Sequence, residues 1–366
     1  MRLEGIDILR GLAVSTVIVY HFYVLLGLTS LDSFTYIHSF GEFGVALFFI
    51  ISGYLIYHSI EYTITHKGIK YGLITYIFHR LFRIIPAYYF NFFIVFIIAA
   101  YSTDMLSTWP LHFIYDQILA HLSFTSFFIY KTSGLGINGA YWTLSIEMLW
   151  YIIVPLLFIF IKKDRYLIFL FILSLLYLWG LDNHFFDTIF HLNPEAHNYT
   201  LLLFYWSFQL PGQLIYFITG IFIYKYYKNN FPQNRYAQYF LFIIIFSIFI
   251  YLTTQKYFIE SFTLRNIVIL ISTALIFILF YQYKLKGLSL LAWIGKISYS
   301  LYLWHMPLLF LINKYILPYK FSLTTITILF LILLLSISSL SYYVIEEGGF
   351  YMRKKFESKI IVGQKK

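Results

Sequence analysis

The stretch GIDILRGLAVSTVIVYHF, residues 5–22, decides the fold, because it opens a membrane-length apolar span that nevertheless carries ionisable side chains. These side chains are Asp7, Arg10 and His21. At about 100° per residue all three share one face of a helix, with His21 about 16 Å further along the axis than Arg10. Ionisable groups are costly in a bilayer and usually functional, so this face is a candidate site.

The composition of the whole chain excludes a soluble globule. Its 366 residues are 60% hydrophobic and only 11% charged, and the mean hydropathy is +0.76. This predicts an all-α integral membrane protein with about ten transmembrane helices. The expected spans are residues 7–27, 43–58, 83–101, 141–162, 165–181, 201–226, 237–253, 265–283, 298–316 and 322–344. With no cysteine, disulfides, thiolate metal sites and a cysteine nucleophile are excluded.

The distribution of basic residues predicts the orientation. With the N-terminus inside, 21 of the 26 lysines and arginines fall in inner segments, so both termini are expected to be cytoplasmic. The five outer ones are Lys131, Lys256, Arg265, Lys314 and Lys320. The net charge of +10 therefore reflects membrane topology, and the expected partner is the lipid bilayer of the cell (cytoplasmic) membrane rather than nucleic acid.

We expect one transmembrane domain over residues 1–345, followed by a basic cytoplasmic tail over 346–366 that lies against anionic headgroups. In the second span, Gly41 and Gly44 predict close packing against the first span.

Arg80 and Arg83 lie three residues apart at the expected inner end of the third span, so their guanidinium groups face one way. Such a pair suits a bidentate contact with phosphate. The alternative is that both arginines only anchor the helix at the cytoplasmic surface.

His21 is the best candidate base, since a neutral imidazole can accept a proton and return it. A packing histidine is the alternative. Glu147 in the fourth span is a buried carboxylate with Thr143 and Tyr151 one turn away on the same face. It is expected to hold a hydroxyl, orient His21 or carry a proton, and the alternative is a structural ion pair with an inner cation such as Arg10.

A second polar stripe follows the ninth span. Ser298, Tyr302 and His305 recur at intervals of four and three residues, which places them on one helix face. His305 is a candidate second site histidine, and a hydrogen-bonding strut between helices is the alternative. No metal site is expected anywhere in the chain.

Taken in order, these segments resemble the acyltransferase 3 family, multi-pass membrane enzymes that modify bacterial cell-surface glycans. The resemblance is carried by GIDILRGLAVSTVIVYHF (5–22), GVALFFIISGYLI (44–56), the pair Arg80 and Arg83, YWTLSIEMLWY (141–151) and ISYSLYLWHMP (297–307). It implies an integral membrane O-acyltransferase that moves an acyl group, acetyl by default, from cytoplasmic acyl-CoA to a hydroxyl of an extracytoplasmic or lipid-linked saccharide. Direct transfer and an acyl-enzyme relay both stay open.

The resemblance also assigns roles. His21 becomes the base or acyl carrier and Arg10 its motif partner, with Asp7 or Glu147 orienting the imidazole. Arg80 and Arg83 become the acyl-CoA phosphate contacts, and the lining candidates are Ser298, Tyr302, His305, Thr143 and Tyr151. Acyl-CoA is then a substrate, no cofactor is expected to stay bound, and other glycan-assembly proteins are candidate partners.

Two positions depart from the family pattern. Ala46 stands where a polar residue often follows Gly-Val, and Glu347-Gly348-Gly349-Phe350 replaces a frequent Glu-x-Pro-Phe, which predicts a less rigid end to the last helix. A transporter or exporter of a lipid-linked saccharide or polysaccharide is the alternative function, but the repeated halves expected of one are not visible. A noncatalytic scaffold would leave the buried ionisable residues unexplained.

Overall fold

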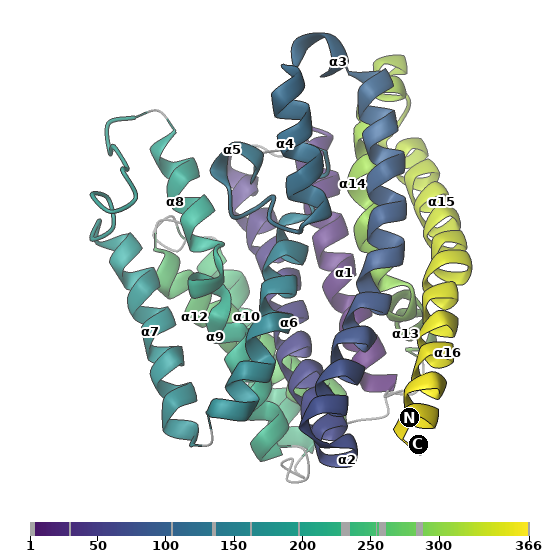
Figure 1. The fold of residues 1–366 in the computed structure, drawn as a ribbon. Coiled ribbons are helices and arrows are strands. Elements are labelled where there is room, and N and C mark those ends of the chain that lie inside the picture. Colours follow the sequence, from purple (N-terminus) through teal and green to yellow (C-terminus); the bar gives the residue numbers. More distant parts are fainter. Residues whose placement is uncertain are drawn as a thin grey trace. The chain divides into compact units, whose positions relative to one another are not determined.

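The computed structural model describes residues 4–28, 31–103, 105–133, 137–161, 163–196, 198–227, 235–253, 255, 261–282 and 288–364 (Figure 1). Over these residues the regular structure is helical, which confirms the predicted all-α class. Lys256, one of the five basic residues expected outside, lies beyond the described residues. The chain forms two compact units: unit 1 is residues 1–58 and 156–296, and unit 2 is residues 59–155 and 297–366.

Unit 1 contains the helices nearest the N-terminus and those in the middle of the chain. They are α1 (Glu4–Leu25), the first part of α2 (Leu31–Ser102), the end of α6 (Trp142–Phe160), α7 (Asp164–Asp182), α8 (Tyr199–Ser207), α9 (Leu210–Phe222) with the π-helical turn η1 (Ile223–Tyr227), α10 (Arg235–Thr253), α12 (Phe262–Gln282) and α13 (Ser289–Lys296).

Unit 2 contains the rest of α2, most of α6 and the C-terminal helices. Its other elements are α3 (Met105–Thr108), α4 (Leu111–Leu122), α5 (Tyr130–Ser133), α14 (Ser298–Tyr315), the 3₁₀ turn η2 (Leu317–Tyr319), α15 (Leu323–Ser341), the π-helical turn η3 (Tyr342–Glu346) and α16 (Glu347–Gln364).

Membrane-length helices dominate both units. Within the described residues, 7 helical stretches are long and apolar enough to cross a membrane. One of them, His38–Ser102, has 65 residues and would be about 98 Å long if straight, far more than the roughly 30 Å of a bilayer core. The chain is thus a multi-pass membrane protein. The predicted number of ten crossings, with both termini inside, stays a prediction.

The long helix α2 turns back on itself at Gly68. This residue has φ 73° and ψ 170°, a conformation that glycine adopts without steric cost. A Cβ atom on Gly72 would lie 2.6 Å from the Cα of Ile64, although eight residues of straight helix would separate them by about 12 Å. Lys67 also donates a hydrogen bond to Thr75 across the turn. The expected second and third spans are therefore two separate helical segments.

In unit 1 the start of α2 packs closely on α1, as the glycines predicted. A Cβ atom on Gly44 would lie 2.4 Å from Thr16 Oγ1, and one on Gly41 would lie 2.5 Å from the Tyr20 ring. Larger residues at these two positions would push the helices apart. This contact fixes the part of α1 that carries Tyr20 and His21.

In unit 2 the last predicted span does not end near residue 344. Helix α15 continues through η3 into α16, the yellow column in Figure 1. The helix does not end at the Gly-Gly pair, and Gly349 serves packing. A Cβ atom there would lie 2.7 Å from the Phe82 carbonyl oxygen, so glycine lets α16 approach α2 closely. Phe356, two turns on, packs against Phe78 with ring centroids 3.8 Å apart.

Candidate functional site

The first candidate group lies on α1, in unit 1. Helix α1 is continuous from Glu4 to Leu25, and Arg10 Nη1 lies 3.6 Å from Asp7 Oδ1, so these two residues share a face as predicted. Asp7 is buried. His21 is half-buried, and its ring centroid lies 4.7 Å from that of Tyr20. The structure therefore places an ion pair at one end of this helix and a histidine beside a tyrosine near the other.

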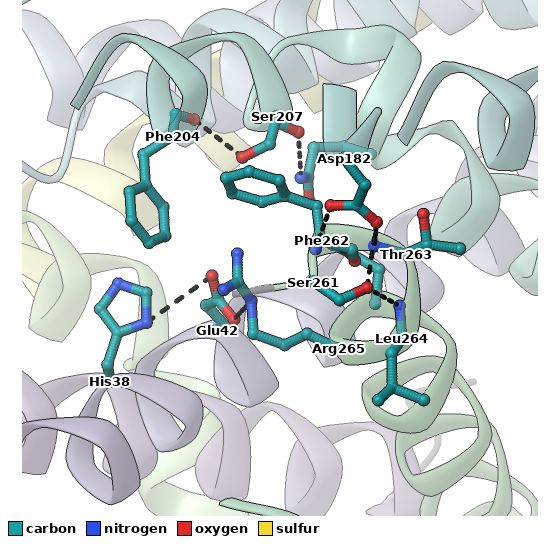
Figure 2. A network of polar contacts seen from close by, with 12 residues as sticks. His38, Glu42, Asp182, Phe204, Ser207, Ser261, Phe262, Thr263, Leu264 and Arg265 are labelled. Carbon is teal, nitrogen blue, oxygen red and sulfur yellow. Dashed lines mark hydrogen bonds and ion pairs between the residues drawn. The ribbon is translucent and has the colours of Figure 1, made fainter. Parts of the chain in front are cut away.

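Unit 1 also contains a buried ion pair that the sequence did not reveal, near Tyr20. Glu42 Oε2 on α2 is 2.9 Å from Arg265 Nε on α12, and Glu42 Oε1 is 3.7 Å from His38 Nδ1 (Figure 2). The Arg265 side chain is 1% exposed and that of Glu42 is 11% exposed. The His38 ring in turn lies 5.5 Å from the Tyr20 ring, in an edge-on arrangement. Unit 1 thus contains a second ionisable cluster, joined through Tyr20 to the position of His21.

The start of α12 explains how Arg265 is positioned. Asp182, the last residue of α7, accepts hydrogen bonds from the backbone N–H groups of Phe262 and Thr263 and from the Ser261 hydroxyl (Figure 2). The Ser261 hydroxyl accepts one from Leu264 N. These contacts satisfy the free N–H groups at a helix N-terminus.

In unit 2 the pair Arg80 and Arg83 sits among aromatic rings. The Arg80 guanidinium carbon lies 5.7 Å from the ring centroids of both Tyr76 and Tyr151. Neither guanidinium group is fully buried. Arg80 has no ion pair with a described residue, and its buried Nε donates no hydrogen bond to one.

Arg83 differs from Arg80 because it has a carboxylate partner. Its Nη1 donates a hydrogen bond to Glu346 Oε2 at 3.4 Å, and the guanidinium carbon lies 5.8 Å from the Tyr299 ring centroid. Glu346 is 2% exposed and its other oxygen accepts a hydrogen bond from Ser300 at 2.6 Å. Glu346 is the first residue of the expected tail, and it lies instead inside the packed unit.

Glu147 belongs to the same group of contacts. Tyr151 donates a hydrogen bond to Glu147 Oε1 at 2.8 Å, which confirms that these two residues share a helix face. The Tyr76 hydroxyl donates to the backbone oxygen of Tyr151 at 3.0 Å. The structure therefore joins Arg80, Tyr151 and Glu147 through one shared tyrosine.

The remaining lining candidates form a separate contact between α6 and α14. The Thr143 and Tyr302 hydroxyls are 2.7 Å apart, and Tyr302 also donates to the Ala140 carbonyl at 3.0 Å. His305 is fully buried, with its Nδ1 2.7 Å from the Tyr302 carbonyl oxygen. Ser298 is buried at the start of the helix. The Tyr302 contacts therefore link two segments of unit 2, whereas the contact of His305 lies within α14.

The site residues that sequence reasoning missed are acidic or aromatic partners of the arginines. Glu42 lies one residue before its expected span, and Glu346 was assigned to the tail. Tyr299 and Ser300 lie on α14 between the predicted Ser298 and Tyr302. Among the residues that the structure describes, no group of three His, Cys, Asp or Glu is arranged to hold a metal ion.

The helices of the described residues define a class, the multi-pass membrane protein. Residues 3–343 match the acyltransferase domain that defines the acyltransferase 3 family, and the chain belongs to that family. It is also 27% identical over 305 residues, 81% of each chain, to a protein of Acidianus two-tailed virus named "Putative acetyltransferase ORF330". No solved structure matches the chain. The protein is thus an acyltransferase, and an enzyme rather than the alternative transporter.

Proposed function

We propose that this membrane enzyme is an O-acyltransferase of the cytoplasmic membrane. It takes an acyl group, acetyl by default, from cytoplasmic acyl-CoA and places it on a hydroxyl of an extracytoplasmic or lipid-linked saccharide. Arg80 and Arg83 hold the phosphates of the donor, and His21 handles the proton of the acceptor. The proposal stays within the family activity and adds the donor, the acceptor class and the residue roles.

The observation that carries the donor assignment is the state of the arginine pair. Arg83 is held in place by Glu346, whereas Arg80 has aromatic neighbours and no ion pair among the described residues. A guanidinium group held this way is pre-organised for a planar, bidentate contact with phosphate. A residue that merely anchored the helix in the headgroup region would not need its Nε buried between two tyrosines.

The chemistry assigned to His21 is a single proton relay. Its neutral imidazole takes the proton of the acceptor hydroxyl as that oxygen attacks the thioester carbonyl carbon. The carbon–sulfur bond then breaks, and the proton passes to the CoA thiolate, which leaves as free CoA. Asp7 and Arg10 act as the ionic partners at the other end of the helix, and Glu147 is the site carboxylate. A positioned base of this kind is worth about 10² to 10⁴ in rate.

The test is release of free CoA from acetyl-CoA by the purified protein in nanodiscs, with a lipid-linked saccharide as acceptor. His21→Ala is expected to lower kcat by about 10² to 10⁴ with the Kd for CoA unchanged. Arg80→Ala/Arg83→Ala is expected to raise that Kd by about 10-fold or more, because hydrogen bonds to charged groups are lost.

Each variant has a matched control in the same protein. His112→Ala removes an exposed histidine, and Lys163→Ala/Arg165→Ala removes two exposed charges that are also expected on the cytoplasmic side. Full turnover by His21→Ala, or equal CoA affinity in the two double variants, would overturn the assignments. A label kept on the protein after exposure to acyl-CoA without acceptor would favour the relay over direct transfer.

A further inference from the structure

A third arginine, from the expected basic tail, lies near the arginine pair in unit 2. We propose that Arg353 on α16 is a phosphate-binding residue that completes the acyl-CoA site of Arg80 and Arg83. This inference rests on the proposed function for its ligand, CoA. It gives the tail helix a role in donor binding instead of a role at the lipid surface alone.

The geometry centres on Phe350. The guanidinium carbon of Arg83 lies 5.5 Å from the centroid of this ring, and that of Arg353 lies 5.6 Å from it, so the two carbons are at most about 11 Å apart. The charges of Glu357, Arg80 and Arg83 all act on Arg353. Two segments far apart in sequence, α2 and α16, thus bring three guanidinium groups into one region of unit 2.

Two of the nearby carboxylates already contact other cations. Glu346 pairs with Arg83. Glu357 contacts both His79 and Lys67, with its Oε1 2.5 Å from His79 Nε2 and 3.7 Å from Lys67 Nζ. The charge of Glu357 also acts on Arg353, but this carboxylate is shared with His79 and Lys67 and does not belong to Arg353 alone.

Arg80 and Arg353 are the two cations left over. Neither has an ion pair with a described residue, and in both the Nε atom is buried without a hydrogen bond to one. Bringing like charges together and burying their donors is unfavourable unless an anion completes the arrangement. Two unpaired guanidinium groups call for an anion with at least two charges, which the phosphates of CoA supply.

The position of Arg353 is fixed by packing. Gly349 allows α16 to lie against the Phe82 carbonyl, and Phe356 packs on Phe78 with ring centroids 3.8 Å apart. On the same turn Lys354 is exposed. The helix therefore presents one cation inward and its neighbour outward, and the second provides a charge-matched control for the first.

The experiment compares Arg353→Ala with Lys354→Ala in nanodiscs of purely zwitterionic lipid, measuring the Kd for CoA and for pantetheine, which has no phosphate. Arg353→Ala is expected to weaken CoA binding about 10-fold or more, without changing pantetheine binding. Lys354→Ala is expected to bind both like wild type. Arg353→Lys should recover part of the loss, because the charge remains without the planar fork.

The outcomes separate this inference from the proposed function. If wild type binds CoA and Arg353→Ala binds it equally well, the third arginine is not part of the site. If the loss appears only in nanodiscs that contain anionic lipid, Arg353 contacts a headgroup and the inference is wrong. If folded wild type binds no CoA, the donor assignment itself fails. A heat-stability comparison of the two alanine variants guards against a loss caused by misfolding.

Discussion

The buried pair of Glu42 and Arg265 can be tested by removing its cation. At 2.9 Å the two charges attract by about 6 kcal/mol at an effective dielectric constant of about 20. That attraction offsets the several kcal/mol that burial costs each ion. In Arg265→Met the carboxylate stays buried without its partner, and we expect the free energy of unfolding to fall by about 3 to 5 kcal/mol.

The double variant Glu42→Leu/Arg265→Met should recover most of this loss. Replacing both ions by apolar side chains removes the unpaired charge together with the pair, and such replacements are often neutral or stabilising. Unfolding by increasing SDS in mixed micelles, followed by tryptophan fluorescence, gives the free energies of wild type, both single variants and the double variant. The cycle then isolates the interaction energy of the pair.

An exposed pair provides the matched control. Lys131 Nζ lies 3.3 Å from Asp116 Oδ2, and these side chains are 57% and 49% exposed. Because solvent screens such a pair, Lys131→Met should change the free energy of unfolding by less than about 1 kcal/mol. The reasoning is refuted if Arg265→Met costs no more than this control, or if the double variant is no more stable than the single one.

Two further predictions concern close packing and pH. A Cβ atom on Gly295 would lie 1.6 Å from the Asp7 carbonyl oxygen, so Gly295→Ala should lower the free energy of unfolding by at least about 1 to 3 kcal/mol. A Cβ atom on Gly348 would have nothing within 4 Å, so Gly348→Ala should be neutral or slightly stabilising. The fraction of protein that stays monodisperse after heating compares the two variants. Burial lowers the pKa of His121 below its usual 6.5. As the pH falls, the unfolded chain therefore binds a proton at His121 before the folded protein does, and the free energy of unfolding should decrease between about pH 7 and pH 5. In His121→Gln this decrease should be smaller than in wild type, and an equal decrease would contradict the prediction.

The fold class could be predicted from the sequence because bilayer-length apolar runs leave few alternatives. Over the described residues, helix covers most of each expected span, and the two glycines of the second span pack on the first as expected. What the sequence did not give is continuity. The last span continues into the tail through η3, because backbone hydrogen bonding carries on where the hydropathy falls. Gly68, whose non-helical conformation turns the chain between the second and third spans, was not singled out by the sequence either.

The candidate site was predicted only in part, and the reason is sequence distance. Local pairs such as Asp7 with Arg10, or Glu147 with Tyr151, follow from helix periodicity, and the structure contains both. The partner of Arg83 lies 263 residues away, so no local pattern could assign it. Helix periodicity predicts which residues share a helix face, whereas tertiary packing determines which carboxylate pairs with which arginine.

The arginines of this protein fall into two physical kinds, and the difference is independent of the family resemblance. Arg265 is fully buried beside a carboxylate, so its charge is compensated within the protein and its loss should appear as lost stability. Arg80 and Arg353 are partly exposed and near each other, and neither forms an ion pair with a described residue, although the charge of Glu357 acts on Arg353. Removing one of them relieves repulsion in the empty protein, so its loss should appear as weaker ligand binding with stability kept or raised. A protein whose unpaired arginines proved essential for folding, and irrelevant to CoA affinity, would contradict this division.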